Sequence, residues 1–296
     1  MSTKPASVII CTRNRTQDIL RCLPSLAAQT YRHFELIIVD SSDIPIIEDG
    51  SSVQAMNQFK PYFKYLHSAP GLTLQRNKGI DIATGEIIYF FDDDVVLEPN
   101  YLAIMQETFA KHATCVGGMG SIINMQLPMP IIWRLFHQLF LLQRDYAAGM
   151  FTLSGMPTHA YGNNIFMHVE LLGGCCMAFR KSVLNKHRFD ETLQRYAYME
   201  DADISWRVSQ EGPLFYQPAA GLYHYASPVA RDSAVENRAM FMRNYRYLFF
   251  KNVYPCNRLH IVAYWWTILG LYLKALLLRD TASVKGYLKA IGYTLR

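Results

Sequence analysis

Short apolar runs alternate with helical patterns through the first half of the chain. Residues 7–11 (SVIIC), 34–39 (FELIIV) and 86–91 (EIIYFF) are runs of the length of a buried strand. Helical spacing of apolar residues covers 16–27 and 72–83, and the threonine that opens the first of these segments is its expected N-cap. Such an alternation predicts a parallel sheet built from βαβ units.

Polar residues follow each apolar run directly. Because the carboxyl ends of parallel strands meet at the edge where open α/β sheets bind ligands, we expect these residues to line one crevice. They are Thr12 and Arg13 after the first run, Asp40 after the second, and Asp92, Asp93 and Asp94 after the third. The chain contains neither the glycine fingerprint of dinucleotide-binding sheets nor a P-loop sequence. The acidic triplet therefore suggests that a divalent cation holds phosphates in this crevice.

The regular alternation ends near Gly120. Residues 128–142 (PMPIIWRLFHQLFLL) are apolar and aromatic but shorter than the roughly 20 residues of a membrane span, which indicates an amphipathic or interface helix. Regular structure is expected to resume at 171–179. A helix that starts near Glu200 follows, and we expect Gly212 to end it as the C′ glycine.

The C-terminal residues are expected to be helical and rich in aromatic side chains. Within them, residues 261–273 (IVAYWWTILGLYL) are uncharged but too short to span a bilayer, and several lysines and arginines follow. This pattern fits docking at a membrane interface, and it fits a buried core helix equally well. Removing the chain after about Tyr254 is expected to raise solubility and abolish binding to anionic vesicles if the segment docks on lipid.

Composition narrows the class of protein. The chain has 296 residues, 51% of them hydrophobic and 18% charged, which is apolar for a soluble protein but far from a multi-span membrane protein. A net charge of +5 does not indicate nucleic-acid binding, although it suits an anionic membrane leaflet or a diphosphate ligand. The N-terminus lacks the pattern of a secretory signal, and the six cysteines show no C-x-x-C spacing. We therefore expect a cytosolic protein with reduced cysteines.

Two acidic clusters carry the candidate chemistry. Three adjacent carboxylates at the end of a buried strand repel one another unless a cation compensates them, whereas in a solvated turn they need no ligand. The second cluster, Glu200, Asp201 and Asp203, stands at a helix N-terminus, where ordinary capping would also explain it. The aromatic residues Tyr196 and Tyr198 just before it favour a wall that packs against a sugar.

The order of the motifs resembles a known family. The chain carries, in this order, SVIICTRNR, ELIIVDSS, RNKGIDIATGEIIYFFDDDVVLEPNYL, GGCCMAFRKSVL, RFDETL and MEDADISWRVSQEG. Over residues 6–226 it resembles the family-two nucleotide-sugar glycosyltransferases of the GT-A fold. The resemblance implies an α/β protein of GT-A type with a mostly parallel, Rossmann-like sheet flanked by helices and a helical C-terminal extension. We expect the chain to divide into a nucleotide-sugar-binding half (1–120), an acceptor-binding and catalytic half (121–230) and a C-terminal helical segment (231–296), for which membrane association is one of the two alternatives given above.

The resemblance also implies roles on the donor side. Thr12, Arg13 and Asp40 match the strand-end residues that hold the nucleoside, and Arg76 lies where a basic residue approaches the donor. Asp92, Asp93 and Asp94 contain the D-x-D motif, in which the first acid faces the ribose and the last coordinates Mn²⁺ or Mg²⁺ on the diphosphate. His224 is a further candidate metal ligand, with a buried, hydrogen-bonded histidine as the alternative.

On the acceptor side, the implied residues surround a general base. Gly173, Gly174 and Cys175 match the loop against which the acceptor packs. Asp201 matches the second acid of an E-D pair, the general base of the family, and Glu200 is placed beside the acceptor.

The activity implied is an inverting, metal-dependent transfer of one sugar from a nucleotide diphosphate sugar. The acceptor would be a glycan or a lipid-linked molecule, and the location the cytoplasmic face of a membrane. The Q-x-x-R-W signature of processive synthases is missing, which favours addition of a single sugar, and Arg188 replaces the usual glycine before FDE. The alternatives are a sugar-phosphate nucleotidyltransferase, which would need a glycine-rich loop after the first strand, and a non-catalytic sugar-binding protein.

Overall fold

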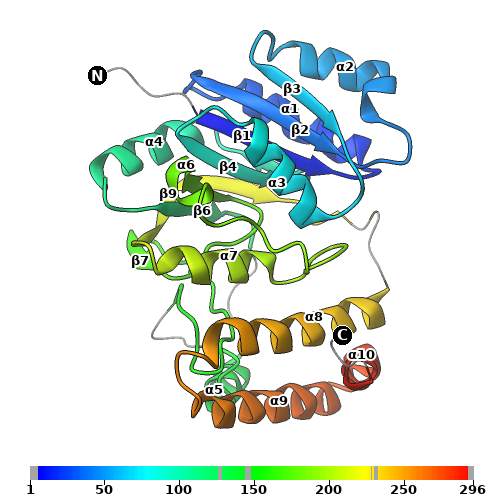
Figure 1. Cartoon of the computed structure of the whole chain (residues 1–296), viewed down its shortest axis with the longest axis vertical. Coiled ribbons are helices and arrows are strands. Elements are labelled where there is room, and N and C mark those ends of the chain that lie inside the picture. The colour runs from blue at the N-terminus through cyan, green and yellow to red at the C-terminus, as the bar shows by residue number, and fades with distance from the viewer. Residues whose placement is uncertain (1–5, 126–128, 144–147, 228, 230–232, 293–296) are drawn as a thin grey trace.

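A nine-stranded sheet runs through the part of the molecule that the structure describes (Figure 1). The computed structural model describes residues 6–125, 129–143, 148–227, 229 and 233–292. The strands are β1 (Ala6–Thr12), β2 (Phe34–Asp40), β3 (Phe63–His67), β4 (Ile87–Asp92), β5 (Val95–Leu97), β6 (Gly117–Ile122), β7 (Met167–Val169), β8 (Met177–Arg180) and β9 (Leu214–His224). Their order is β3-β2-β1-β4-β8-β6-β9-β5, and β7 pairs with β9.

The N-terminal half of this sheet is parallel, as the sequence predicts. β1 pairs in parallel with β2 and β4, and β2 pairs in parallel with β3. The register places Thr12 opposite Asp40, and Cys11 opposite Asp92. Gly85 allows β4 to start close to β1, because a Cβ there would lie 2.4 Å from the backbone carbon of Ala6. The three strand ends therefore meet at one edge, as expected.

The second half of the sheet is mixed. β8 pairs antiparallel with both β4 and β6, while β6 and β9 are parallel. β5 and β7 pair antiparallel with β9. The expected α/β class is confirmed, and the parallel character belongs to the half that carries the βα alternation.

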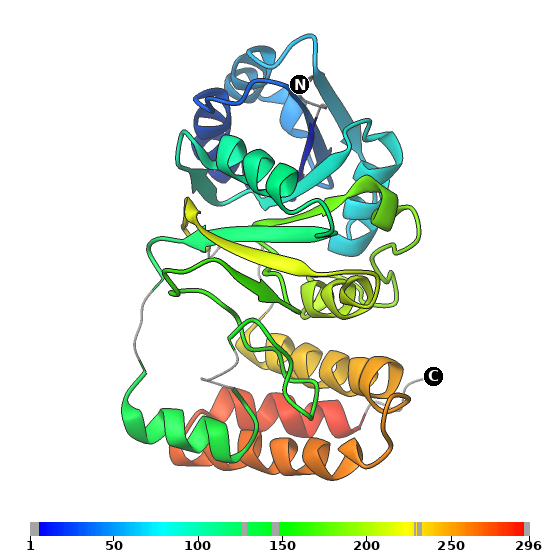
Figure 2. The ribbon, with the colours of Figure 1, turned by 90° about the vertical axis from the view of Figure 1, so that its left-hand side faces the viewer.

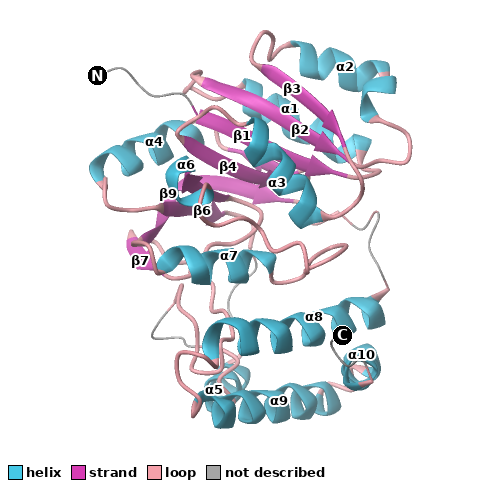
Figure 3. Ribbon diagram, viewed as in Figure 1, coloured by secondary structure: helices cyan, strands magenta, loops and turns pink. Residues whose placement is uncertain are grey.

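Helices cover the sheet and form the C-terminal region (Figure 3). They are α1 (Thr16–Ala27), α2 (Gly50–Asn57), α3 (Leu72–Ile82), α4 (Tyr101–Lys111), α5 (Ile131–Leu139), α6 (Lys181–Leu184), α7 (Glu200–Ser209), α8 (Ala234–Leu248), α9 (His260–Leu277) and α10 (Thr281–Ile291). A 3₁₀ turn, η1, spans Ile46–Glu48, and a π-helical turn, η2, spans Phe249–Val253.

Several boundaries differ from the predictions. Thr16 is the first residue of α1 rather than its N-cap, a position that Arg15 takes without a side-chain hydrogen bond. α7 ends at Ser209, and Gly212 lies beyond it, where a Cβ would come within 2.9 Å of Val116. Gly212 is therefore needed for close packing rather than as a left-handed cap. The regular structure expected over residues 171–179 begins only at Met177, where β8 starts.

The C-terminal helices share a second hydrophobic core beneath the sheet domain (Figure 2). Tyr245 and Phe249 from α8 and η2 pack against Tyr264 of α9 and Tyr287 of α10, all of them buried. The ring centroids of Phe249 and Tyr264 lie 4.4 Å apart. Removing the chain after Tyr254 would uncover this core, so that truncation cannot separate lipid docking from core packing.

Helix α5 lies beside α9. The indole Nε1 of Trp266 donates a hydrogen bond to the carbonyl of Leu139 at 2.7 Å, and its ring stacks on Phe140 with centroids 5.0 Å apart. The amphipathic helix expected at 128–142 is present from Ile131 to Leu139, while Pro128 lies outside the described residues. Large apolar side chains remain exposed on these two helices. Among them are the residues that we call the apolar face: Ile131, Ile132, Leu135, Leu139, Val262, Trp265, Trp266 and Leu269.

Helix α9 is longer than the uncharged segment suggested. It contains 18 residues, of which 28% are buried, and within the described chain it is the helix whose length and composition would allow it to cross a bilayer. Such helices also occur in the cores of soluble proteins. One side of α9, which carries Thr267 and Leu271, is buried against the second core. The other side, which carries Trp265, is exposed.

Candidate active site

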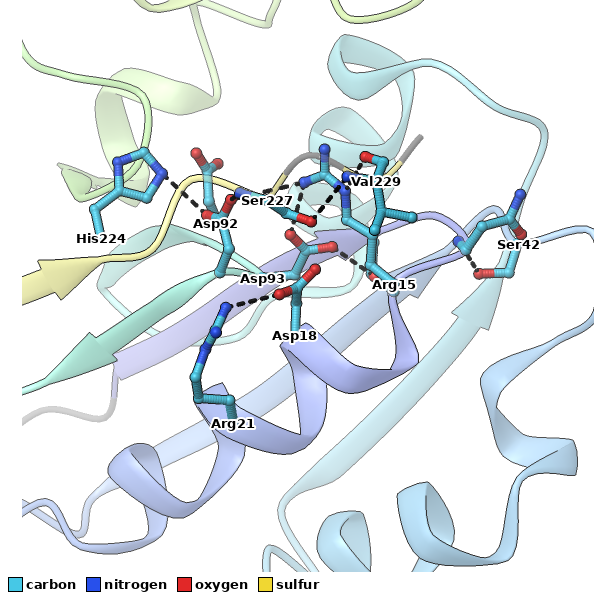
Figure 4. A network of polar contacts seen from close by, with 12 residues as sticks. Arg15, Asp18, Arg21, Ser42, Asp92, Asp93, His224, Ser227 and Val229 are labelled. Atoms are coloured by element: carbon cyan, nitrogen blue, oxygen red, sulfur yellow. Dashed lines mark hydrogen bonds and ion pairs between the residues drawn. The ribbon is translucent and has the colours of Figure 1, made fainter. Parts of the chain in front are cut away.

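The acidic triplet stands where β4 ends beside β1. Thr12 Oγ1 donates a hydrogen bond to Asp93 Oδ2 at 2.7 Å, and Arg15 Nη1 donates to Asp93 Oδ1 at 3.0 Å (Figure 4). Burial raises the pKa of Asp93 to about 7 against the opposing effect of the Arg15 charge. The Nε of Arg15 also donates to the carbonyl of Val229. Asp93 therefore joins the end of β1 to the segment after β9, with both of its oxygens engaged.

Asp94 contacts two residues at and just after the end of β9. Its Oδ2 accepts a hydrogen bond from the Ser227 amide at 2.8 Å. Its Oδ1 is buried and lies 3.0 Å from Nε2 of His224, with which it forms an ion pair when the imidazole is protonated. Burial would raise the pKa of Asp94, but His224 and the Ser227 amide lower it to about 2. The pairing of β5 with β9, which sets Val95 opposite His224, explains how residues 130 positions apart meet.

The residues at this point fit a divalent cation. Ligand atoms of Asp92, Asp94 and His224 lie within 4.8 Å of one another. The Oδ1 of Asp94 is a buried carboxylate oxygen whose neighbour is His224 Nε2, so a cation bound between this oxygen and a neutral imidazole would satisfy both. Carboxylate oxygens suit Mg²⁺ and Mn²⁺, and an imidazole nitrogen is the softer ligand that Mn²⁺ also accepts.

Arg76, expected to approach the donor, lies in the floor of the site. Its side chain is 3% exposed and forms an ion pair with Glu200, while Nη2 lies 3.4 Å from Asp92 Oδ1 and donates to the Gly174 carbonyl at 3.0 Å. The guanidinium also lies over the ring of Phe189, 5.2 Å from its centroid. Arg76 thus joins the candidate metal ligands to the acidic pair that opens α7.

The first turn of α7 packs against the glycine loop before β8. The amide of Gly174 donates to Asp201 Oδ2 at 3.0 Å. A Cβ at Gly173 would lie 1.6 Å from Tyr161 Oη, so only glycine fits there. Glu200 is buried, and its carboxylate is paired with Arg76 and with the Asp201 amide. Burial raises the pKa of Glu200 well above its usual range.

The segment before α7 has an unusual backbone. Arg195, Ala197 and Met199 have φ values of 62°, 51° and 70°, in the left-handed region that residues with a side chain rarely adopt. Three such residues within five positions are typical of segments where surrounding contacts hold a strained backbone at a functional site. Tyr196 and Tyr198 alternate with them and remain partly exposed. No sequence pattern predicted this conformation.

One cavity of about 730 Å³ collects most of the predicted residues. From the sequence-based set it contains Thr12, Arg13, Arg76, Asp92, Asp93, Asp94, Gly173, Gly174, Cys175, Glu200, Asp201 and His224. It also contains residues that the sequence did not single out, among them Arg15, Met156, His159, Tyr161 and Phe241. The signal for Arg15 was its place in the TRNR motif, whereas no sequence signal marked the others.

Asp40 is the exception. It is fully buried, and its carboxylate accepts hydrogen bonds from the amides of Ser42 and Ile46 and from the hydroxyl of Tyr65. Its side chain is turned into the protein, away from the cavity, and shapes the loop after β2. The structure therefore does not place Asp40 among the residues that line the cavity, and its contact with the nucleoside stays a prediction.

Comparison with known proteins identifies the family. The family model described as "Glycosyl transferase family 2" matches residues 7–188. The chain belongs to this family. As a family-two glycosyltransferase it is 36% identical over 227 residues to EpsH of Bacillus subtilis (strain 168), a glycosyltransferase by name; the match covers 76% of this chain and 61% of EpsH. A second relative, the uncharacterized glycosyltransferase YibD of Escherichia coli (strain K12), is 35% identical over 106 residues, which are 35% of this chain and 30% of YibD.

Solved structures show the same fold. The crystal structure of GalNAc-T7 with UDP, GalNAc and Mn²⁺ matches this glycosyltransferase with a TM-score of 0.64 at 16% identity, over 86% of this chain and 50% of that one. The structure of S. aureus TarS 1-349 in complex with UDP-GlcNAc matches with a TM-score of 0.60 at 16% identity, over 97% and 80%. The GT-A fold is thus confirmed. The family model ends at residue 188, so Asp201 and His224 lie outside the matched segment.

Proposed function

We propose that this family-two glycosyltransferase moves one sugar from a nucleotide diphosphate sugar to an acceptor hydroxyl, with inversion and with Mn²⁺ or Mg²⁺. One observation carries the proposal: a candidate metal cluster of Asp92, Asp94 and His224 shares a cavity with Asp201 at the start of α7. A cation site for the diphosphate and a carboxylate for the acceptor are the two parts that such a transfer needs.

The residues of the cavity divide between the two substrates. Thr12, Arg13 and Arg15 line the donor side, next to the acidic triplet. The solved structures with UDP or UDP-GlcNAc have the same fold, which supports a nucleotide-sugar donor. Bound at Asp92, Asp94 and His224, a divalent cation would neutralise the charge that develops on the departing diphosphate.

Asp201 is the proposed general base. Its carboxylate is held by the Gly174 amide and faces the cavity. As the acceptor oxygen bonds to the anomeric carbon, Asp201 takes the hydroxyl proton, and the bond from that carbon to the diphosphate oxygen breaks. The nucleoside diphosphate leaves with the bonding electrons. Because attack and departure occur on opposite faces in one step, the anomeric configuration is inverted.

The acceptor side is aromatic. Tyr196, Tyr198 and Phe241 line the cavity near Asp201, and the ring of Tyr198 meets that of Phe241 edge-on at 5.8 Å between centroids. Such rings pack against the apolar face of a sugar. The acceptor is accordingly a sugar hydroxyl of a glycan or of a lipid-linked saccharide, and the missing processive signature supports addition of one sugar.

Release of nucleoside diphosphate from a panel of sugar nucleotides tests the proposal. We expect release that requires both an acceptor and Mn²⁺ or Mg²⁺, and a product of inverted configuration by NMR. Family membership favours a glycosyltransferase over the sugar-phosphate nucleotidyltransferase and the non-catalytic sugar-binding protein. Transfer that persists unchanged after removal of divalent ions would contradict the proposed metal dependence. Retained anomeric configuration would contradict the proposed single displacement.

A membrane surface is the proposed location. Residues 233–292 contain nine lysines and arginines and two aspartates and glutamates. The excess of positive charge in this segment is larger than the net charge of +5 of the whole chain. This basic region carries the half of the apolar face that lies on α9, with Arg258 before that helix and Arg279 after it. An apolar helical face flanked by basic residues suits the cytoplasmic leaflet, where anionic lipids gather. Peripheral docking there leaves the buried side of α9 in the second core.

Replacing two residues of the apolar face tests this docking. The side chains of Ile132 and Trp265 are exposed, at 71% and 62%, so an Ile132→Glu/Trp265→Glu variant should fold normally. Burial of a large apolar side chain contributes roughly 1.5–3 kcal/mol, so binding to phosphatidylglycerol vesicles should fall about 100-fold or more. Co-sedimentation measures it. Ile44→Glu is the matched control, since Ile44 is 72% exposed on the N-terminal half. Equal binding by the double variant would exclude this surface.

A further inference from the structure

A lysine of the C-terminal region reaches the helix that carries the proposed base. Lys251 lies in η2, and its Nζ donates to Asp203 Oδ1 at 2.8 Å and to Asp190 Oδ2 at 2.6 Å. Asp203 is in the first turn of α7, two positions after Asp201, and its side chain has no exposed surface. The contact therefore joins segments far apart in the sequence next to the proposed base.

Asp203 is completely satisfied by this arrangement. Its Oδ2 accepts two hydrogen bonds from Arg207, at 3.0 and 2.6 Å, and its Oδ1 accepts one from Asn252 at 3.0 Å as well as that from Lys251. With Asp190, the group holds two carboxylates and two cations. Buried carboxylates are stable only when paired and hydrogen-bonded in this way, and such a network fixes the direction of each member.

Asp190 holds the other end of the strained segment. It accepts a hydrogen bond from the hydroxyl of Tyr247 at 2.7 Å, in addition to that from Lys251. Between Asp190 and α7, the carbonyl of Tyr198 accepts a hydrogen bond from Asn244 Nδ2 at 2.7 Å. The segment from 190 to 203 is thus held at both ends and near its middle by α8 and η2.

The backbone of η2 supports a specific role. A π-helical turn costs stability relative to a continuous α-helix and is frequent at functional sites. Here it contains both Lys251 and Asn252, two neighbouring residues that reach the same oxygen of Asp203. Lys251 is also 26% exposed, so water near its ammonium leaves it charged at lower cost than full burial would.

We propose that Lys251 is a positioning residue for the transfer reaction. By holding Asp203 and Asp190 together, it fixes the first turn of α7 and the strained segment before it, and so places Asp201 against the acceptor. The proposal rests on the function proposed above for Asp201. It makes the C-terminal region part of the catalytic apparatus, in addition to any contact with a membrane.

A Lys251→Gln variant of the full-length chain tests the role. A misplacement of about 1 Å can lower turnover about 100-fold, so we expect kcat to fall roughly 10- to 100-fold while Mn²⁺-dependent donor binding stays within about twofold. Lys251→Arg, which keeps the charge, should recover part of kcat. Amide exchange measured by mass spectrometry should become faster in the peptide 195–205, where a lost anchor allows local opening.

Two further variants keep the test decisive. Lys289→Gln removes an ion pair with Glu236 in the same C-terminal region and should leave kcat and exchange unchanged. Asn252→Ala removes one hydrogen bond to Asp203 without changing charge, and should lower kcat in the same direction but less. Normal kcat in Lys251→Gln overturns the proposal, and so does loss of donor binding together with kcat in both Lys251→Gln and Asn252→Ala. If the wild-type chain transfers no sugar, the function fails, while the exchange measurement still decides whether Lys251 orders this segment.

Discussion

Asp201→Asn is expected to lower turnover by about 10²–10⁴-fold while the affinity for the sugar nucleotide hardly changes, because positioned general-base catalysis commonly contributes that range. The amide keeps the size of the side chain, and its oxygen can still accept the hydrogen bond from Gly174. The change removes the ability to take a proton, and it also removes the second acceptor oxygen, Oδ1, which takes a hydrogen bond from the Ala202 amide. Donor binding depends on the other side of the cavity, where the acidic triplet lies.

Initial rates and calorimetry on the same preparation separate these two effects. Glu211→Gln, just beyond the C-terminal end of α7, is the control, since this acid pairs with Lys186 and His187 near the surface and should be dispensable for turnover. Glu200 is a poor control. Glu200 is the buried partner of Arg76, so Glu200→Gln also disturbs the floor of the site. Near-normal turnover of Asp201→Asn would remove Asp201 as the base.

Asp94→Asn is expected to abolish most of the metal-dependent part of donor binding. The buried Oδ1 of Asp94 faces His224, and an amide would remove the negative charge there while leaving a group able to accept from the Ser227 amide. Even residues that only orient metal ligands contribute roughly 10- to 100-fold to affinity, so loss of a direct ligand should cost at least as much.

Calorimetric titration of the sugar nucleotide with and without Mn²⁺ measures this loss. Wild-type protein stripped of divalent ions and Asp94→Asn in Mn²⁺ should bind the donor equally weakly. Asp18→Asn is the control: this acid lies in the first turn of α1 and pairs with Arg21. Unchanged affinity of Asp94→Asn in Mn²⁺ would remove Asp94 from the metal site and leave the D-x-D assignment without support.

The sequence predicted the strands that are buried on both faces of the sheet. β1, β2 and β4 are continuous apolar runs because neighbouring strands and helices enclose them. β3 was missed because four of its five residues are only half-buried and the fifth is exposed, so the short segment FKYLH carries little signal. α2 was missed because serines and glutamine dominate a short helix. Partial burial removes the contrast on which periodicity depends.

The site was predictable as far as the strand ends determine it. Asp92 and Asp94 come together with His224, whose possible role the sequence suggested. The direction of a side chain was beyond reach: Asp40 ends β2 in the expected place, yet it is turned inward to its own loop. The partners of Lys251 lie 48 and 61 residues away, with no periodicity to connect them. Tertiary packing alone brings such pairs together.

The distribution of tryptophan gives the chain a built-in optical reporter. Three of its four tryptophans, Trp133, Trp265 and Trp266, lie on α5 and α9, while Trp206 lies on α7 with its ring against Phe151. Indole emission moves to shorter wavelength when lipid replaces water around the ring, and indoles favour the membrane interface. Unlabelled protein should therefore signal lipid contact by its own fluorescence. In a variant that keeps only Trp206, the fluorescence would instead report on α7, the helix that carries Asp201. Fluorescence could therefore report on the membrane-facing helices and on the catalytic helix separately.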